Sequence, residues 1–522
     1  MQKGRIAVKA NREKNKSIKN SIGRAAFVAL SLLLQIGWLV SLVNRAGQYY
    51  PYIALATEIL VLAAVVGIYS QNRNSAGGTS WIVLILIFPV LGLCLYLLLG
   101  QPWATHSMRR RFENIDQSLA GRLPQDQMLM RRIEKEDPDV IGQMRYILQW
   151  GKYPVYENTT VEFHAQTEAA FEALKTELRK AEKFIFMEYH AIELSECFLE
   201  LEEILAERAK AGVEVRLFYD DVGSLTFIGP NFVQRMEALG IHCQVFNPIM
   251  PVISAFMNNR DHRKITVIDG KVGFTGGYNL ADEYFNVKHP YGHWKDTGIL
   301  LRGEAVRSLT VMFLEMWNAA RKRDEDYSSY TGVSYGEIQS DGYVQPYADS
   351  PLDDERLGEN VYLNMLKSAR HYAWITTPYL ILDDEMIQEL ILAAKRGVDV
   401  RIITPGIPDK KVVFQLTRSY YAPLVRGGVR IFEYTPGFLH AKQMLVDDRS
   451  AVVGTINLDF RSLYLHFENA VLLHGCSAIR DIRRDFEDTF PLCREMTEKY
   501  KGKRAVCIRV GQSLLRLFAP LL

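Results

Sequence analysis

The sequence predicts an α/β protein made of two tandem copies of one unit, preceded by an apolar N-terminal region. Three observations support this prediction. Apolar runs crowd the region before residue 100, strand and helix patterns alternate after residue 159 and then recur, and a five-position motif occurs once in each copy. At 522 residues, the chain is also too long for one small core.

Residues 1–24 are expected to form a basic cytoplasmic leader, because they carry eight Lys and Arg residues against one acid, Glu13. Apolar runs follow at about 25–43, 53–69 and 81–99. A bilayer takes about 20 apolar residues to cross, so 25–100 is expected to be a transmembrane region of two or three spans. Glu58 makes the second run the weakest candidate, since a carboxylate is costly at mid-bilayer.

The arginines at 109–111 argue that the chain beyond the third run is also cytoplasmic, which agrees with the leader only if one run does not cross. Residues 101–158 are expected to be a linker. At the other end, 499–522 alternates basic and apolar residues. Such a tail suits either an amphipathic helix on an anionic membrane surface or a helix packed on the protein's own core.

The duplicated unit is visible in the order of its elements. A strand pattern at 184–189, a helix pattern at 197–211 and a strand pattern at 213–219 recur as 373–377, 384–395 and 398–404. The offset between copies is about 170 to 190 residues. We therefore expect a first α/β sandwich unit at 159–335 and a second at 336–498, each with a mainly parallel sheet, sharing one active site.

The repeated motif reads HxK, four residues, D, six residues, G, two residues, N. Its first copy comprises His262, Lys264, Asp269, Gly276 and Asn279, and its second comprises His440, Lys442, Asp447, Gly454 and Asn457. Residues two apart on a strand share a face, so each histidine projects beside its lysine. One HxK means little, but five positions repeated at equivalent points of a duplicated unit are a specific signal.

Two imidazoles and two ammonium groups around one pocket suit a phosphodiester. Lysine offsets phosphate charge, a neutral histidine can attack phosphorus, and a second histidine can protonate the leaving oxygen. His262, Lys264, His440 and Lys442 are therefore the predicted catalytic residues. Asp269 and Asp447 are expected to orient or support the histidines, with a simple turn role as the alternative.

Four more polar residues are candidates for the site. Asn279 and Asn457 are expected to bind phosphate oxygens. Asp296 and Glu468 occupy matching positions in the two copies and are expected to hold the histidine of the opposite half, although a structural salt bridge explains them equally well. His466 lacks the HxK context and is interpreted as surface or structural.

The cysteine pattern and the net charge indicate which cofactors and partners are not expected. The six cysteines form no CxxC pair or His/Cys cluster, so neither a metal site nor a disulfide framework is indicated, and no cofactor is expected. The net charge of +2 and the apolar runs speak against a nucleic-acid substrate.

The motif resembles the HxKxxxxDxxxxxxGxxN signature of the phospholipase D superfamily. Over nearly the whole chain, the sequence is similar to bacterial cardiolipin synthases, with Asp261 in place of the usual Asn. The similar segments are Asn258–Lys264, Gly276–Asn279, Trp294–Asp296, Phe438–Lys442, Gly454–Ser462 and Phe467–Asn469.

The resemblance implies a metal-free, two-step reaction at a multi-pass bacterial cell membrane. His262 would attack one phosphatidylglycerol while His440 protonates the departing glycerol, and a second phosphatidylglycerol would take the phosphatidyl group to give cardiolipin. Three alternatives remain open: a hydrolase or transferase to another alcohol, a superfamily nuclease, and a non-catalytic membrane scaffold.

Overall fold

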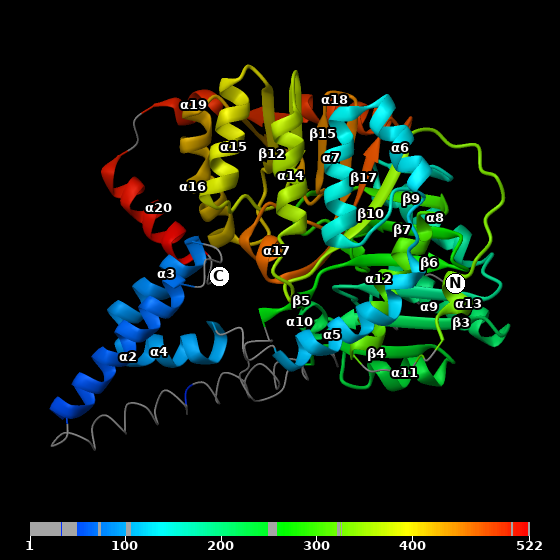
Figure 1. Ribbon diagram of the computed structural model, residues 1–522, viewed down its shortest axis with the longest axis horizontal. Coiled ribbons are helices and arrows are strands. Elements are labelled where there is room, and N and C mark those ends of the chain that lie inside the picture. Colours follow the sequence, from blue (N-terminus) through cyan, green and yellow to red (C-terminus); the bar gives the residue numbers. More distant parts are fainter. Residues whose placement is uncertain are drawn as a thin grey trace.

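The computed structural model describes residues Leu33, 50–70, 75–100, 106–248, 258–320, Asp324, 326–502 and 505–519. Two α/β lobes pack against each other, and the helices near both chain ends project from one side of them (Figure 1). The predicted basic leader and, apart from Leu33, the predicted first span at 25–43 lie outside the described residues.

The second and third apolar runs form separate helices. α2 spans Tyr50–Ser70, α3 spans Ser75–Ile87, and α4 spans Pro89–Leu95 before a π-helical turn at Tyr96–Gly100. Pro89 has no N–H and begins α4, so the third run is divided in two. Within the part of the chain that the structure describes, no helix has both the length and the apolar composition needed to cross a bilayer, so the expected spans are not confirmed there.

The segment at 101–158, predicted as a linker, is folded over most of its length. It contains α5 (His106–Leu119), α6 (Gln127–Glu136) and α7 (Pro138–Tyr146), with short helical turns at Ala120–Arg122 and Ile147–Gly151. Apolar residues on one face of α6 are buried, among them Leu129 and Ile133. The segment therefore contributes to the core instead of acting as a spacer.

The first lobe is built on a seven-stranded sheet in the order β1-β9-β7-β6-β2-β3-β4. Its strands are β1 (Thr159–His164), β2 (Phe184–Tyr189), β3 (Glu214–Asp220), β4 (His242–Phe246), β6 (Lys264–Ile268), β7 (Val272–Gly276) and β9 (Gly298–Gly303). Its helices are α8 (Thr167–Leu178), α9 (Glu196–Lys210), α10 (Asp221–Ser224), α11 (Phe232–Ala238), the 3-10 turn η7 (Asp282–Phe285), α12 (Val306–Ala320) and α13 (Ser328–Thr331).

The second lobe repeats this order as β10-β17-β16-β15-β11-β12-β13 and adds β18 at the edge. Its strands are β10 (Tyr343–Asp349), β11 (Tyr372–Thr376), β12 (Asp399–Pro405), β13 (Arg430–Tyr434), β15 (Gln443–Val446), β16 (Ser450–Gly454), β17 (His466–His474) and β18 (Cys493–Glu495). Its helices are α14 (Leu357–Ser368), α15 (Asp384–Lys395), α16 (Lys411–Arg426), α17 (Phe460–Tyr464), α18 (Ala478–Thr489) and the 3-10 turn Phe490–Leu492.

Each sheet is mixed, and the expectation of a mainly parallel sheet is wrong. In the first lobe only β2, β3 and β4 pair in parallel, whereas β1, β9, β7 and β6 pair antiparallel. The reason is the tight turn inside each motif, which joins β6 to β7 in the first lobe and β15 to β16 in the second. Asp269 and Gly270 both adopt positive φ angles there, and a turn this short can only join antiparallel strands.

Two short parallel pairings cross from one lobe to the other. β5 (Arg260–Asp261) pairs with the start of β17, and β14 (Gly437–Leu439) pairs with β8 (His293–Lys295). Each pairing brings the residues before a motif histidine beside a strand of the other lobe. The equivalent connections in the two lobes therefore meet at the interface between them.

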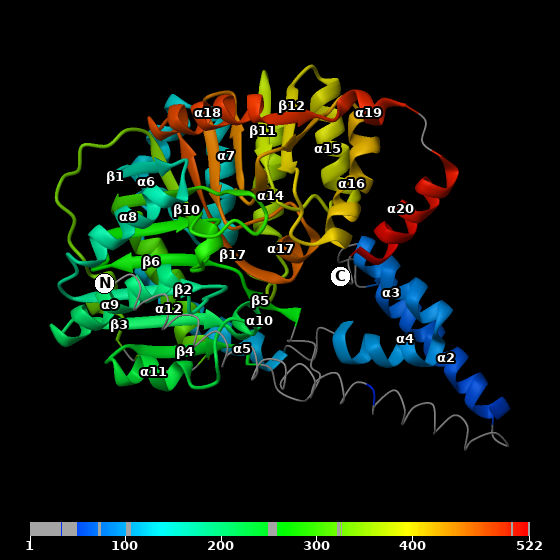
Figure 2. The same ribbon diagram turned by 180° about the vertical axis from the view of Figure 1, so that it is seen from behind.

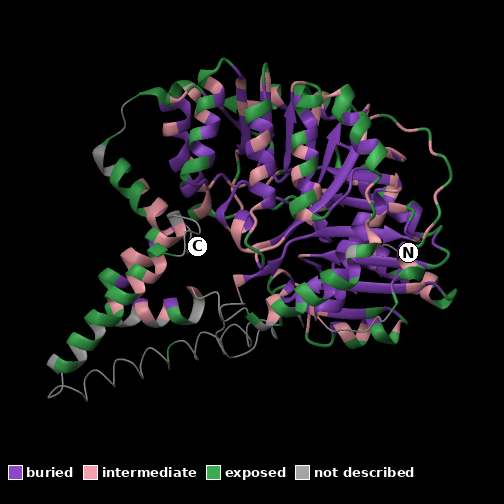
Figure 3. Ribbon diagram, viewed as in Figure 1, coloured by how far each residue is buried: buried purple, intermediate pink, exposed green. Residues whose placement is uncertain are grey.

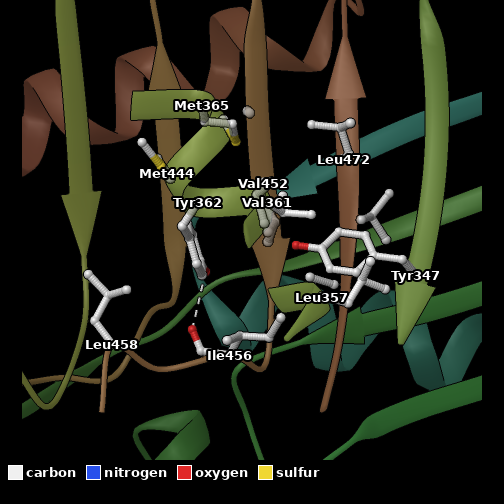
Figure 4. Close-up of a cluster of buried hydrophobic side chains, with 14 of the residues drawn as sticks. Tyr347, Leu357, Val361, Tyr362, Met365, Met444, Val452, Ile456, Leu458 and Leu472 are labelled. Atoms are coloured by element: carbon white, nitrogen blue, oxygen red, sulfur yellow. Dashed lines mark hydrogen bonds between the residues drawn. The ribbon is translucent and has the colours of Figure 1, made fainter. Parts of the chain in front are cut away.

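The strands of both sheets are buried over most of their length, and the covering helices expose their outer faces (Figure 3). Figure 4 shows part of the second lobe's core, where Tyr347, Val361 and Leu472 pack together. In the same cluster the hydroxyl of Tyr362 donates a hydrogen bond to the carbonyl of Ile456 at 3.2 Å. This contact anchors the backbone just before Asn457, one of the predicted site residues.

The C-terminal tail is helical, with α19 at Thr497–Lys501 and α20 at Val506–Phe518. α20 lies beside α3 (Figure 2), and the hydroxyl of Ser80 donates to the carbonyl of Leu517 at 2.6 Å. The C-terminal helix is thus joined to α3 of the apolar N-terminal region. Even so, α20 leaves several apolar side chains exposed, namely Ile508, Val510 and Leu514.

Candidate active site

His262 sits where the first lobe meets β17 of the second. It follows β5, and its backbone N–H donates to the carbonyl of Phe467 at 2.9 Å. Its Nδ1 lies 2.9 Å from both carboxylate oxygens of Glu468, the residue after Phe467. The side chain of Glu468 is fully buried. The second lobe therefore fixes both the backbone and the ring of the first lobe's histidine.

His440 is held by equivalent contacts, with the roles of the two lobes exchanged. It follows β14, and its backbone N–H donates to the carbonyl of Lys295 at 2.7 Å. Its Nδ1 lies 2.6 Å from Oδ2 of Asp296, which is also fully buried. Here the first lobe fixes the histidine of the second.

These contacts determine which ring nitrogen of each histidine is available for chemistry. A carboxylate only accepts hydrogen bonds, so Nδ1 of each imidazole carries the proton and donates it. Nζ of Lys442 also lies 2.7 Å from Nδ1 of His440, but it donates to the carbonyl of His440, and the shorter contact of Nδ1, at 2.6 Å, is with Asp296. Nε2 is then the nitrogen with a lone pair in the neutral ring. Both motif histidines are thereby held in one tautomer and orientation, as a nucleophile or a proton carrier requires.

The two lysines are buried beside the histidines. Nζ of Lys264 donates to the carbonyl of His262 at 2.6 Å, and Nζ of Lys442 donates to the carbonyl of His440. Burial lowers the pKa of Lys264 to about 8 and that of Lys442 to about 7. The second effect on Lys442 is the attraction of Asp296, which opposes this decrease. An anion arriving between the two ammonium groups would favour their charged forms.

Burial and nearby positive charge keep the motif histidines neutral. Burial, followed by the charge of Lys442, lowers the pKa of His440 to about 4. Burial, together with Lys264 and Lys442, lowers the pKa of His262 well below its ordinary value. For Asp296, burial alone would raise the pKa, but Lys442 and His440 bring it below its ordinary value. The site thus contains neutral imidazoles beside an ionised carboxylate.

The structure does not bring Asp269 and Asp447 to the histidines, so the prediction that they support them directly is wrong. Asp269 follows β6, about 16 Å along the strand from Lys264. Its carboxylate accepts backbone N–H groups from Glu182, Lys183 and Phe184 at 2.7 to 2.8 Å.

Asp447 has the same role in the second lobe. Its carboxylate accepts the backbone N–H groups of Arg370, His371 and Tyr372 at 2.7 to 2.9 Å. Both aspartates adopt left-handed backbone angles, which Asp tolerates better than most residues. They fix the start of the neighbouring strand, β2 or β11, and correspond to the turn role that the sequence left open.

Asn279 and Asn457 are both buried, but their side chains have different partners. Oδ1 of Asn279 accepts from the N–H of Ala191 at 3.1 Å, and its Nδ2 donates to the Tyr284 hydroxyl at 3.0 Å. Oδ1 of Asn457 has no hydrogen-bond partner among the described residues. The pseudo-symmetry of the motifs therefore does not extend to every side chain around them.

The surroundings of the two histidines also differ. Two imidazoles flank His262, with ring centroids 4.9 Å (His190) and 5.6 Å (His466) from its own. Aromatic rings enclose His440 instead, with centroids 5.2 to 5.8 Å away: Trp294, Tyr284 and Phe438.

Most of these neighbours were not among the predicted site residues. His466, interpreted as surface or structural, reaches His262 only through the pairing of β17 with β5. Trp294 precedes Asp296 by two positions, as His466 precedes Glu468. That matched spacing was one available signal, and the resemblance of the segments Trp294–Asp296 and Phe438–Lys442 to the family was another.

One group of side chains within the described residues has ligand atoms close enough to share a metal ion: His262, His466 and Glu468, within 4.8 Å of one another. Their chemistry does not suit a cation. Nδ1 of His262 is already bonded to Glu468, and Nε of Arg461 donates to Nε2 of His466 at 3.2 Å. Two buried lysines nearby add positive charge, which would repel a metal ion.

Comparison with known proteins gives a consistent picture. Residues 362–490 match the family model described as cardiolipin synthase, PLD-like domain, and residues 59–101 match the phospholipase D-nuclease N-terminal model. A cardiolipin synthase of Geobacillus kaustophilus is 32% identical over 94% of this chain and 98% of its own. Another, from a Geobacillus species, is 35% identical over 90% of this chain and 93% of its own.

An uncharacterized protein of Streptococcus mutans is 42% identical, covering 88% of this chain and all of its own. Among solved structures, phosphatidylserine synthase of Haemophilus influenzae aligns with a TM-score of 0.54 at 14% identity, covering 73% of this chain and 98% of its own. At that identity the likeness concerns the fold alone.

Asp296 contacts a motif histidine whereas Asp269 contacts only backbone N–H groups, and this difference gives a first prediction. Asp296→Asn should lower kcat by about 10²–10⁴-fold, because an amide cannot hold His440 in the reactive tautomer as a carboxylate does. Asp269→Asn should lower the unfolding free energy by about 1–3 kcal/mol and change kcat less than about tenfold. Steady-state kinetics and thermal unfolding of both variants check this. Equal losses of kcat in the two would contradict the assignment.

The histidines also predict a loss of stability in acid. The pKa of His440 is about 4 in the fold but about 6.5 in an unfolded chain, so the unfolded chain binds more protons between these values. Stability should therefore fall as pH decreases through this window, and His262, His190 and His466, whose pKa values are also lowered, add to the effect.

His440→Gln should reduce the slope of stability against pH by up to about 1.4 kcal/mol per pH unit. Chemical denaturation at several pH values between about 4 and 7 measures it. A slope that stays the same in the variant would show that His440 is not a neutral buried base.

Proposed function

Because this chain belongs to the cardiolipin synthase family, we propose that it is a phosphatidyltransferase that makes cardiolipin and glycerol from two molecules of phosphatidylglycerol. One observation carries the mechanism. Each motif histidine donates Nδ1–H to a carboxylate of the opposite lobe, at 2.9 Å for His262 and 2.6 Å for His440. Two reactive Nε2 atoms and two lysines are then available to one phosphodiester.

In the first half-reaction, Nε2 of His262 forms a bond to phosphorus as the bond from phosphorus to the glycerol oxygen breaks. The anionic phosphodiester beside His440 favours uptake of a proton at Nε2, and the resulting imidazolium passes this proton to that oxygen, so glycerol leaves neutral and His440 becomes neutral again. Lys264 and Lys442 offset the charge on the phosphate oxygens. Asn279 and Asn457 are proposed to bind these oxygens as well.

In the second half-reaction, the terminal hydroxyl of another phosphatidylglycerol gives its proton to Nε2 of His440. Its oxygen bonds to phosphorus as the bond to His262 breaks. The pKa of both histidines is lowered, so the choice of His262 as the nucleophile is supported by the surroundings of His440. The aromatic rings around His440 suit a transient imidazolium there, as does the carboxylate of Asp296.

We further propose that the protein works at an anionic bacterial membrane, with the apolar N-terminal region as its multi-pass anchor and α20 on the lipid surface. α2 exposes a set of apolar side chains: Leu55, Ile59, Leu62 and Val66. α20 exposes Ile508, Val510 and Leu514 along with Arg509. Such surfaces suit lipid better than water. A Cβ on Gly77 of α3 would lie 3.0 Å from Phe460, so this region adjoins the second motif.

The product distribution tests the reaction. The purified chain, incubated with phosphatidylglycerol vesicles and excess EDTA, should form cardiolipin and glycerol in equal amounts, measured by mass spectrometry. His262→Gln should reduce turnover by at least about 10³-fold, because no nucleophile remains. Phosphatidic acid as the sole product would make the protein a hydrolase, and turnover of a nucleic acid instead of the lipid would support a nuclease.

The membrane proposal predicts where lipid contacts the protein. A phospholipid with a photoreactive acyl chain, in vesicles containing the full chain, should label peptides from α2 and α20. Met128 and Trp150 provide an internal control, because they are 76% and 62% exposed but lie on the helical segment at 106–151. Labelling of that segment as strong as that of α2 would contradict the proposed orientation.

A further inference from the structure

A hydrogen-bond donor without a partner lies beside His440. Nε1 of Trp294 is buried and has no hydrogen-bond partner among the described residues. The whole residue is 5% exposed. A buried N–H without an acceptor is unfavourable, since it has lost its bond to water and gained nothing. Within the fold this donor is therefore a candidate to bind a ligand.

The position of Trp294 connects it to the reaction. It belongs to β8, two residues before Asp296, the carboxylate that holds His440. Its ring centroid is 5.2 Å from that of His440 and 4.8 Å from that of Phe438. The indole is thus a wall of the space around the second histidine.

Tyr284 adds a second donor to the same wall. Its ring lies 4.5 Å from Trp294 and 5.4 Å from His440. The Tyr284 hydroxyl accepts a hydrogen bond from Nδ2 of Asn279 at 3.0 Å, which leaves its own O–H to donate. Burial raises the pKa of this hydroxyl, so it keeps its proton.

The described residues around His262 form no such wall. The motif spacing makes His466 the counterpart of Trp294 and Ser462 the counterpart of Tyr284. Side chains that differ at matching positions of a duplicated unit distinguish the two sides of the pocket. Among the described residues, only the His440 side offers aromatic surface together with an indole N–H and a phenol O–H.

We propose that Trp294 and Tyr284 form the subsite for the glycerol group that leaves and for the polyhydric alcohol that replaces it. This inference rests on the proposed function, in which His262 attacks phosphorus. In-line displacement then puts the departing and incoming oxygens on the opposite side, at His440. The neighbouring hydroxyl oxygens of the alcohol accept from Nε1 of Trp294 and from the Tyr284 hydroxyl, and its carbons lie against Phe438.

The subsite explains how the enzyme would choose an alcohol over water. A water molecule cannot contact the aromatic rings and accept from both Trp294 and Tyr284 at once, whereas a glycerol headgroup can. An alcohol with a single hydroxyl can react but leaves the indole N–H unpaired. An alcohol that leaves a buried N–H without a hydrogen bond binds less well, so this donor discriminates strongly between alcohols.

A competition between acceptors tests the proposal. The full chain, in phosphatidylglycerol vesicles, is given equal concentrations of deuterated glycerol and deuterated 1-propanol, and the two phosphatidyl alcohols are measured by mass spectrometry. Wild-type protein should favour glycerol. Trp294→Phe keeps the aromatic wall but removes the N–H, and should reduce the preference about tenfold. Tyr284→Phe should also reduce it.

Trp374→Phe is the matched control. Nε1 of Trp374 is likewise buried without a partner among the described residues, but its ring packs on Tyr372 and Phe490. This variant should keep the wild-type preference. Thermal unfolding identifies any variant that is not folded, and the product ratio is independent of how much protein is active.

An unchanged glycerol preference in folded Trp294→Phe would overturn the subsite, as would a wild-type protein with no preference. Failure of the proposed function looks different: wild-type protein would then form neither cardiolipin nor any phosphatidyl alcohol.

Discussion

Two buried hydrogen bonds across the lobe interface determine the geometry of this site. His262 donates to Glu468 at 2.9 Å, and His440 donates to Asp296 at 2.6 Å. Each bond takes its donor from one lobe and its acceptor from the other, so neither lobe alone can orient a reactive ring. The short pairings β5–β17 and β8–β14 hold the corresponding backbones in register. The duplicated fold is therefore a requirement of the chemistry, because each copy completes the other.

Burial of these hydrogen bonds also changes the pKa values of the charged groups in the site. Two lysines, two carboxylates and two neutral imidazoles share a space from which most water is excluded, and the pKa values of Lys264 and Lys442 decrease to about 8 and about 7. A site of this kind costs the free protein stability, because charged and polar groups are buried without full compensation. A bound phosphodiester supplies the missing negative charge, so the interactions are strongest when the reacting group is present.

The sequence predicted the parts of this arrangement that depend on spacing, and failed where contacts arise only in three dimensions. The repeated motif located both histidines and lysines, and matched positions located Asp296 and Glu468. Asp269 was misassigned because the five residues of β6 carry it to the far end of the strand. The mixed sheet was not predicted, although the tight turn at Asp269 and Gly270, inside the motif, reverses the chain between β6 and β7. Trp294 and His466 were not predicted as site residues, since they reach the histidines through strands of the opposite lobe.

Mapping the covalent intermediate tests the central claim most directly. The enzyme is mixed with phosphatidylglycerol vesicles, quenched within the first turnover, and digested for mass spectrometry under conditions that preserve phosphohistidine. The account predicts a phosphatidyl adduct on the peptide that contains His262, reduced at least about tenfold by Glu468→Gln in the opposite lobe. An adduct confined to His440, or one on His262 that Glu468→Gln leaves unchanged, would contradict a nucleophile held across the lobe interface.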